Sequence, residues 1–387
     1  MAAEGQPDLE RRVRTRLDEL DAGGLTRALR APAGIDLSSN DYLGLSTHPI
    51  LKSRMAEAAE QEGCGSTGSR LLRGERESFT NLESRFARFK GVDRALYFSS
   101  GYLANLAVLS TLAEAGDVIY SDELNHASLI DGMRLSRARR VIFPHNDTAA
   151  LEQLLREEST PGQRFVVTES LFSMDGDFAP LAEYAALCRT HNAALIVDEA
   201  HAVGIYGARG SGLLEESGVE PLLSVNTAGK ALGVSGAFVA GPAWAIEYLI
   251  QKARPFIFST AAPPPVAAAI DASLSILESE PWRRRQLLDR AAYLRRRLGE
   301  SVVVLPPGRS QIVPVLLGEN ERAVQVARAL QQAGFDARAV RPPTVAPGTA
   351  RLRLSVNANL SEETLERFVT ALSAALQNST LCSAVSL

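Results

Sequence analysis

The sequence predicts an α/β protein with a large, mostly parallel-sheet domain and a smaller C-terminal α+β domain. Between about residues 95 and 240, short β-rich runs alternate with stretches of helical periodicity. Several of these runs are almost wholly apolar, as expected for strands that a parallel sheet buries on both faces. Beyond about residue 280 the pattern becomes helix, strand, helix, strand, strand, helix. We therefore expect an N-terminal arm (1–50), a large domain (51–280) and a small domain (281–387).

The expected elements follow in chain order. The arm should carry one helix. The strands of the large domain are expected at ALYFSS, DVIYSD, RVIFPH, RFVVTES, AALIVDEAH, LLSVNTAG and AFVAG. Helical periodicity marks Asn105–Ala115, Thr148–Glu157 and Leu181–His191 between them. In the small domain QIVPVLLG, DARAVRP and ARLRLSVNA should be strands, while NERAVQVARALQQAGF and SEETLERFVTALSAAL should be helices.

Composition excludes several classes of protein. The 387 residues are 45% apolar and 22% charged with a net charge of −4, so neither nucleic acid nor an anionic membrane is an expected partner. The three cysteines, Cys64, Cys188 and Cys382, match neither a disulfide framework nor a zinc pattern. We therefore expect no metal site. The charged start and the lack of any long apolar run predict a cytoplasmic protein.

Polar residues cluster where the expected strands end. Ligands collect at the carboxyl ends of strands in an open α/β sheet. The residues at these ends are Ser99, Gly101, Tyr102, Asn105, His126, Glu169, Ser170, Ser173, Asp198, His201, Thr227 and Lys230. Each also has a structural interpretation, because a strand-end aspartate often caps a helix and a loop lysine often faces solvent. Their occurrence together favours a functional site.

Lys230 points to a particular cofactor. It lies among small neutral residues, where an ammonium group loses its proton more easily and the free amine can form a Schiff base. Asp198 could hold the protonated pyridine nitrogen of pyridoxal phosphate (PLP), and the turn at Gly101–Tyr102 leads into a helix whose N-terminus suits a phosphate. Together these residues predict a PLP site in the large domain.

Six motifs extend this prediction to a family. GCGSTGSRLLRGE, SSGYLAN, FSMDGDFAPL, VDEAHAVG, GKALGVSGAF and RPPTVAPGTARLRLS resemble, in order and spacing, the α-oxoamine synthases, over roughly residues 15 to 375. These are PLP-dependent transferases of fold-type I that join an amino acid to an acyl thioester and release carbon dioxide. The stretch AVRPPTVAPGTARLRL (339–354) favours the branch that condenses L-alanine with pimeloyl-CoA or pimeloyl-acyl carrier protein in biotin biosynthesis.

The resemblance implies roles for the cofactor residues. Lys230 forms the internal aldimine and later acts as the base at the amino acid's Cα, while Asp198 pairs with the pyridinium nitrogen. His126 stacks on the ring and also belongs to the catalytic and substrate-binding residues. The remaining implied cofactor residues are Gly101, Tyr102, Ser173, His201, Thr227 and Thr260.

The resemblance also implies substrate contacts and a partner. Arg353 would grip the amino acid's carboxylate, and Arg27 and Thr344 match positions near the substrate. Thr260 belongs to a segment that reaches the phosphate site of a neighbouring subunit, so the implied assembly is a homodimer. The sequence departs from the family at Ala228, where an aromatic or bulky apolar residue is more usual.

Other functions remain open at this stage. An aminotransferase or an aldolase would share the Asp198 and Lys230 chemistry without needing the 341–355 segment. Another α-oxoamine synthase, such as a glycine C-acetyltransferase, is the alternative within the family. A protein that keeps the PLP fold without turnover is the alternative outside the enzymes.

Overall fold

The structure is a computed structural model that describes residues 6–157, 160–300 and 305–384. The chain folds into two compact units. The large unit comprises residues 40–288 and 357–359, and the small unit comprises residues 1–39, 289–356 and 360–387. The first 39 residues therefore group with the C-terminal part of the chain. The sequence predicts an arm, a large domain and a small domain. The two units do not test this three-part division, which stays a prediction.

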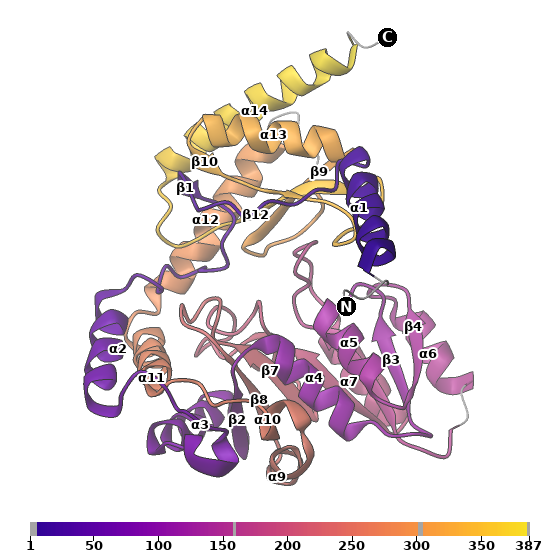
Figure 1. Cartoon of the computed structure of the whole chain (residues 1–387), viewed down its shortest axis with the longest axis vertical. Helices are drawn as coiled ribbons and strands as arrows, with labels where there is room; N and C mark the ends of the chain where they lie inside the picture. The colour runs from indigo at the N-terminus through magenta and orange to yellow at the C-terminus, as the bar shows by residue number, and fades with distance from the viewer. Residues whose placement is uncertain (1–5, 158–159, 301–304, 385–387) are drawn as a thin grey trace. The chain divides into compact units, whose positions relative to one another are not determined.

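A seven-stranded sheet forms the centre of the large unit (Figure 1). The strand order is β2-β8-β7-β6-β5-β3-β4. All seven β-rich runs of the sequence form strands, which are β2 (Arg94–Phe98), β3 (Val118–Asp122), β4 (Arg139–Phe143), β5 (Arg164–Glu169), β6 (Ala193–Asp198), β7 (Leu223–Thr227) and β8 (Ala237–Gly241). In β6 the side chains of Leu195, Ile196 and Val197 are at most 4% exposed, because helices and loops cover both faces of the sheet.

The sheet is parallel except at one strand. Strand β8 runs antiparallel to both β7 and β2, and the other neighbouring pairs are parallel. Strands β2 to β7 therefore share one direction, and their carboxyl ends lie along the same edge of the sheet. That edge is where the sequence places its polar cluster.

Helices surround this sheet. Within the described residues of the large unit they are α2 (Pro49–Glu62), the π-helical turn η1 (Arg70–Gly74), α3 (Glu77–Lys90), α4 (Gly101–Leu112), α5 (Ala127–Leu135), α6 (Thr148–Glu157), α7 (Leu181–Thr190), α8 (Leu213–Ser217), α9 (Ala243–Lys252), α10 (Arg254–Ile257) and α11 (Pro264–Ser279). Helix α4 packs on β7 and β8, and α11 packs on α2. Helix α4 begins four residues earlier than the helical periodicity indicates, because the Ser100 side chain caps it by accepting the Leu103 N–H at 3.2 Å.

The small unit contains a three-stranded antiparallel sheet in the order β11-β12-β9. Its strands are β9 (Ile312–Gly318), β11 (Ala339–Val340) and β12 (Ala350–Ser355). A two-residue strand of the arm, β1 (Ile35–Asp36), pairs in parallel with β10 (Phe335–Asp336). The helices are α1 (Gln6–Ala22), α13 (Asn320–Gln332) and α14 (Glu362–Ala384), and the division between the units falls inside α12 (Trp282–Gly299).

None of the described helices is both long enough and apolar enough to cross a lipid bilayer.

Candidate active site

Lys230 lies in the loop that joins β7 to β8. The loop is closed by backbone hydrogen bonds from Ala228 N–H to the Gly236 carbonyl at 2.8 Å and from Gly233 N–H to the Lys230 carbonyl at 2.8 Å. The Thr227 hydroxyl lies 3.1 Å from that same Gly236 carbonyl and accepts the Gly229 N–H at 3.1 Å. The loop therefore presents the lysine side chain from a well-defined turn. Ala228, where the family more often carries a larger residue, is fully buried.

The lysine amine meets His201. Lys230 Nζ lies 2.7 Å from His201 Nε2, and His201 Nδ1 lies 2.7 Å from the Tyr42 hydroxyl. Tyr42 also lies 3.0 Å from Asn40 Oδ1, which can only accept a hydrogen bond. The Tyr42 proton goes to Asn40, so His201 Nδ1 donates to Tyr42 and Nε2 accepts from Lys230. This network assigns the His201 tautomer and directs the lysine.

Asp198, the last residue of β6, is 6% exposed. Its Oδ2 atom accepts a hydrogen bond from Asn105 Nδ2 at 2.6 Å, and its Oδ1 atom accepts one from the Ala200 N–H at 2.8 Å. Each carboxylate oxygen of Asp198 therefore has a hydrogen-bond donor that holds it in place at the sheet edge.

Asn105 links Asp198 to His126. The same amide nitrogen lies 2.9 Å from Ser128 Oγ, which lies 2.8 Å from His126 Nδ1. His126 caps α5, because its Nδ1 atom accepts the Ser128 N–H at 3.2 Å. With Nδ1 as acceptor, the ring proton is on Nε2. Desolvation lowers the pKa of His126, Asp198 raises it and the Lys230 charge lowers it, with a net downward shift that favours the neutral ring.

Glu169 brings a second carboxyl group to this edge. It ends β5 directly opposite Asp198 in the parallel register and is 3% exposed. Burial, with repulsion from Asp198, raises the pKa of Glu169 to about 8, against the opposing effects of the Lys230 charge and the His126 N–H. Glu169 is therefore mostly protonated at neutral pH. Its Oε1 atom has no hydrogen-bond partner among the described residues.

The start of α4 lies beside the end of β7. A Cβ atom on Gly101 would lie 3.9 Å from Thr227 Oγ1, so these two residues adjoin. The first N–H groups of a helix have no acceptor inside the helix, and its N-terminus carries a partial positive charge. Gly101 and Tyr102 therefore offer backbone donors to an anion. The Tyr102 side chain is 40% exposed and donates to Asp131 of α5.

The other predicted cofactor residues lie in loops of the large unit. Ser173 is half-buried in the turn that follows β5. Thr260 is exposed and lines a cavity of about 20 Å³ beside Ser99, at the end of β2. That volume holds no more than about one water molecule.

The predicted substrate residues Arg27, Thr344 and Arg353 all lie in the small unit. An Arg27 Nη atom donates to the Pro342 carbonyl at 3.2 Å, so the arm meets the turn that carries Thr344. Arg341 donates to the carbonyls of Gly24 and Thr26, the latter at 3.1 Å, and thereby holds the arm against this turn. Arg353 lies in β12 with 8% exposure.

The comparisons with known proteins decide the family. Residues 32–372 match the family model of aminotransferase class I and II. The chain is 45% identical to an 8-amino-7-oxononanoate synthase of Geobacter sulfurreducens, over 94% of this chain and 97% of the relative. It is 42% identical to the same-named protein of Dechloromonas aromatica, over 94% of this chain and 99% of the relative.

The chain belongs to the 8-amino-7-oxononanoate synthase family. The resemblance found in the sequence motifs is thereby confirmed.

Solved structures of an 8-amino-7-oxononanoate synthase and of related enzymes share the fold of this chain. The serine palmitoyltransferase of Sphingomonas wittichii superposes with a TM-score of 0.90 at 30% identity, covering 98% of this chain and 100% of that one. The 8-amino-7-oxononanoate synthase of Francisella tularensis superposes with a TM-score of 0.78 at 30% identity, covering 90% and 99%. Another similar structure is of a protein called SPT with a PLP internal aldimine. The predicted fold class, a fold-type I PLP-dependent transferase, is confirmed.

The large unit has the groups that PLP requires in an 8-amino-7-oxononanoate synthase. An amine, a buried carboxylate and a helix N-terminus all lie at one sheet edge. The charges of Lys230 and Asp198 both influence the pKa values of His126 and Glu169. These residues fit PLP.

Sequence reasoning missed two members of this network, Tyr42 and Ser128, and it gave Asn105 no specific role. Nothing in the sequence assigns a role to Tyr42 or Ser128, and Asn105 stands out only as a polar residue near the edge. Asn105 is one helical turn after Gly101 and is buried in α4. An asparagine among the apolar residues of a helix is the signal in the sequence that points to it.

Proposed function

We propose that this protein condenses L-alanine with a pimeloyl thioester to give 8-amino-7-oxononanoate, carbon dioxide and the free thiol, a step of biotin biosynthesis. In this reaction the alanine Cα forms a bond to the thioester carbonyl carbon, the thiol leaves, and the alanine carboxyl group leaves as carbon dioxide. The names of the relatives support the assignment. The observation that carries it in this chain is the Lys230–His201 contact beside the buried Asp198.

Lys230 is proposed to hold the cofactor covalently and to move the proton at Cα. PLP, when bound, supplies an aldehyde for amines and a ring that withdraws electrons from Cα. His201 Nε2 accepts a hydrogen bond from Lys230 Nζ and thereby orients the amine. A base must lie within reach of the proton that it removes, and the contact with His201 fixes where the amine lies.

Asp198 and the α4 N-terminus are proposed to orient the ring from its two ends. The Asp198 carboxylate would keep the ring nitrogen protonated, and the Asn105 hydrogen bond holds that carboxylate in place. Gly101, Tyr102 and Thr227 would bind the phosphate. His126 would cover one ring face, held by Ser128, while Ser173 would lie near the ring.

The small unit is proposed to supply the substrate contacts. Arg353 would bind the alanine carboxylate, where a guanidinium can donate two parallel hydrogen bonds. Arg27 and Thr344, which adjoin through Pro342, would contact the pimeloyl substrate. Burial, with repulsion from Arg27 and Arg30, lowers the pKa of Arg341, and this gathering of positive charge suits a substrate that ends in a carboxylate.

The proposal includes a cytoplasmic homodimer in which Thr260 reaches the phosphate site of the second copy. The acyl group is carried either by coenzyme A or by acyl carrier protein.

A competition assay tests the proposed substrates. The purified protein, loaded with PLP, receives L-alanine and glycine together with pimeloyl-CoA and acetyl-CoA, and mass spectrometry identifies the products. We expect 8-amino-7-oxononanoate to dominate, and we expect Lys230→Ala to form none of it. Preference for glycine and acetyl-CoA would instead identify a glycine C-acetyltransferase.

A further inference from the structure

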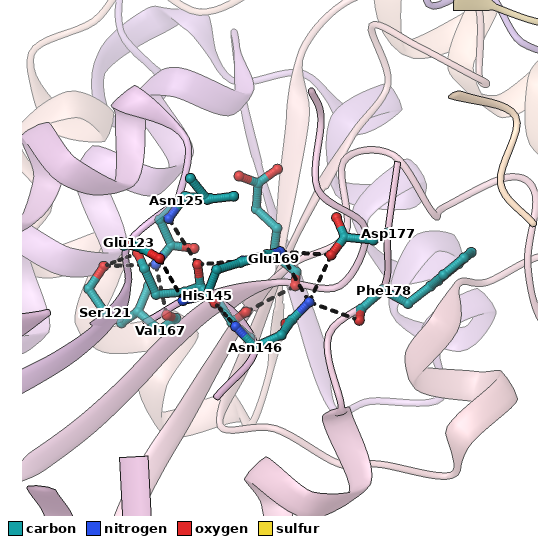
Figure 2. A network of polar contacts seen from close by, with 12 residues as sticks. Ser121, Glu123, Asn125, His145, Asn146, Val167, Glu169, Asp177 and Phe178 are labelled. Atoms are coloured by element: carbon teal, nitrogen blue, oxygen red, sulfur yellow. Dashed lines mark hydrogen bonds and ion pairs between the residues drawn. The ribbon is translucent and has the colours of Figure 1, made fainter. Parts of the chain in front are cut away.

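A second polar cluster lies at the same sheet edge, centred on His145 (Figure 2). His145 follows β4, and its side chain is 20% exposed. Its Nδ1 atom lies 2.9 Å from Asp122 Oδ1, and its Nε2 atom lies 2.7 Å from Asp177 Oδ2. The proposed reaction uses none of these three residues. The ring also meets Phe172 edge-on, with 4.4 Å between the ring centroids.

The two contacts define the charge of His145. A carboxylate can only accept a hydrogen bond, whereas a neutral imidazole has one donor and one acceptor. Donation to both Asp122 and Asp177 therefore requires both ring protons, which makes the ring an imidazolium. Burial alone would lower the pKa of His145, but the hydrogen bonds and charges of the two aspartates outweigh it and raise the pKa to about 10.

Asp122 belongs to the turn that carries His126. It is the last residue of β3, its side chain is fully buried, and its Oδ1 atom also accepts the Leu124 N–H at 2.9 Å. Asn125 continues this turn. Its backbone N–H donates to the Asp122 carbonyl, and its side-chain amide donates to the Val167 carbonyl at 2.8 Å. The next residue is His126. The position of His126 therefore depends on the turn that Asp122 organises.

Asp177 belongs to the turn that carries Ser173. Phe172 N–H donates to the Asp177 carbonyl at 3.0 Å, and Gly176 N–H donates to the Phe172 carbonyl at 3.0 Å, which closes the turn around Ser173. Asn146, next to His145, reinforces the connection. Its backbone N–H donates to Asp122 Oδ2 at 2.9 Å and its amide group donates to Asp177 Oδ2 at 2.9 Å.

We propose that His145 is a positioning residue for the cofactor ring: it joins the turn that carries His126 to the turn that carries Ser173 and fixes these two side chains relative to each other. The part that concerns the ring rests on the proposed function. The connection between the two turns does not.

Hydrogen–deuterium exchange of the cofactor-free, full-length protein tests the connection. His145→Gln is uncharged, and both of its N–H donors are on one nitrogen, so it cannot replace two ring nitrogens that face different carboxylates. We expect exchange to accelerate by about tenfold or more in peptides that cover 122–128 and 171–178, because a hydrogen bond to a charged group is lost at each turn. Peptides from β7 (223–227) should not change. His191→Gln, the same substitution at the end of α7, is the matched control and should alter neither turn.

Asp177→Asn tests the second turn without the first. It also keeps the proposal testable if His145→Gln does not fold. It removes the ionic contact of the second turn and leaves Asp122 with His145. We expect faster exchange at 171–178 and unchanged exchange at 122–128. Unchanged exchange at 171–178 in a folded variant, or acceleration of similar size throughout the sheet including β7, would overturn the proposal.

The loaded enzyme tests the consequence for the ring. We expect His145→Gln to alter the visible circular dichroism per bound PLP and to lower kcat, with KM for L-alanine within about twofold of the wild type. A merely structural residue would change neither the dichroism per bound PLP nor kcat of the folded fraction, and that result would overturn the positioning role. Because the exchange experiment uses no substrate, failure of the proposed reaction and failure of the connection are seen separately.

Discussion

Asn105 Nδ2 lies 2.6 Å from Asp198 Oδ2, across 93 residues of sequence, and both side chains are buried. This hydrogen bond connects helix α4, whose N-terminus is proposed to bind phosphate, with the carboxylate proposed to bind the ring nitrogen. One helix therefore serves both ends of the proposed cofactor site.

Asn105→Ala should leave the covalent attachment of PLP intact and lower kcat/KM for L-alanine. Loss of a hydrogen bond to a charged group costs about 1.5–3 kcal/mol, which corresponds to roughly ten- to a hundredfold in rate. Steady-state kinetics measure the effect, with Ser110→Ala of the same helix as control. An Asn105→Ala enzyme with wild-type kcat/KM would show that Asp198 does not depend on this contact.

Glu169→Gln should stabilise the cofactor-free protein increasingly as the pH rises from about 5 to 8. The pKa of Glu169 is raised from 4.5 to about 8 in the folded state, so over this range the unfolded chain ionises while the folded one stays protonated. Folding of the wild type therefore becomes less favourable with increasing pH. Glutamine removes this cost. Thermal unfolding at several pH values measures the stability of both proteins. A difference in melting temperature that does not change with pH would contradict the raised pKa.

His145 should also make the wild type less stable as the pH rises, here because a favourable charge is lost. Its folded-state pKa is raised from 6.5 to about 10, so its contribution to stability is complete below pH 6.5 and is lost as the pH rises through 10. The excess melting temperature of the wild type over His145→Gln should be greatest near pH 6 and should shrink toward pH 10. The other titratable groups that contact it are Asp122, Asp177 and Glu123. An excess that grows with pH would refute an imidazolium at this position.

Lys90→Met should destabilise the protein strongly. Lys90 Nζ lies 2.5 Å from Glu199 Oε2, and the two side chains are only 3% and 0% exposed. Removing one partner of a buried ion pair leaves an unpaired charge and costs about 3–5 kcal/mol. Urea unfolding measures the change, and Lys252→Met, at an exposed position of α9, is the control. Equal midpoints for the two variants would mean that the pair contributes little.

The strands were predictable because burial on both faces demands continuous apolar runs, as in Leu195, Ile196 and Val197 of β6. Strand direction was harder, since an apolar run such as that of β8 has no direction of its own. The antiparallel course of β8 was nevertheless implied by the nine residues (228–236) that separate it from β7, too few for a helical crossover.

The site was predictable only in part, for a similar reason. Strand ends are local features, so Asp198 and Lys230 could be placed at the sheet edge from the sequence. Contacts between distant segments have no local signature. The Tyr42–His201 contact joins residues 159 positions apart, and nothing near Tyr42 in the sequence indicates a histidine. Likewise, the sequence does not single out His145, because its two aspartates come from different turns.

The most direct test of the central claim follows the fate of the alanine carboxyl group. The PLP-loaded protein is incubated with pimeloyl-CoA and with L-alanine whose carboxyl carbon carries an isotopic label, and both the organic product and the released gas are analysed by mass spectrometry. We expect unlabelled 8-amino-7-oxononanoate and labelled carbon dioxide in equal amounts, and neither with Lys230→Ala. Label retained in the product, or release of labelled carbon dioxide by Lys230→Ala at the wild-type rate, would contradict the proposed condensation.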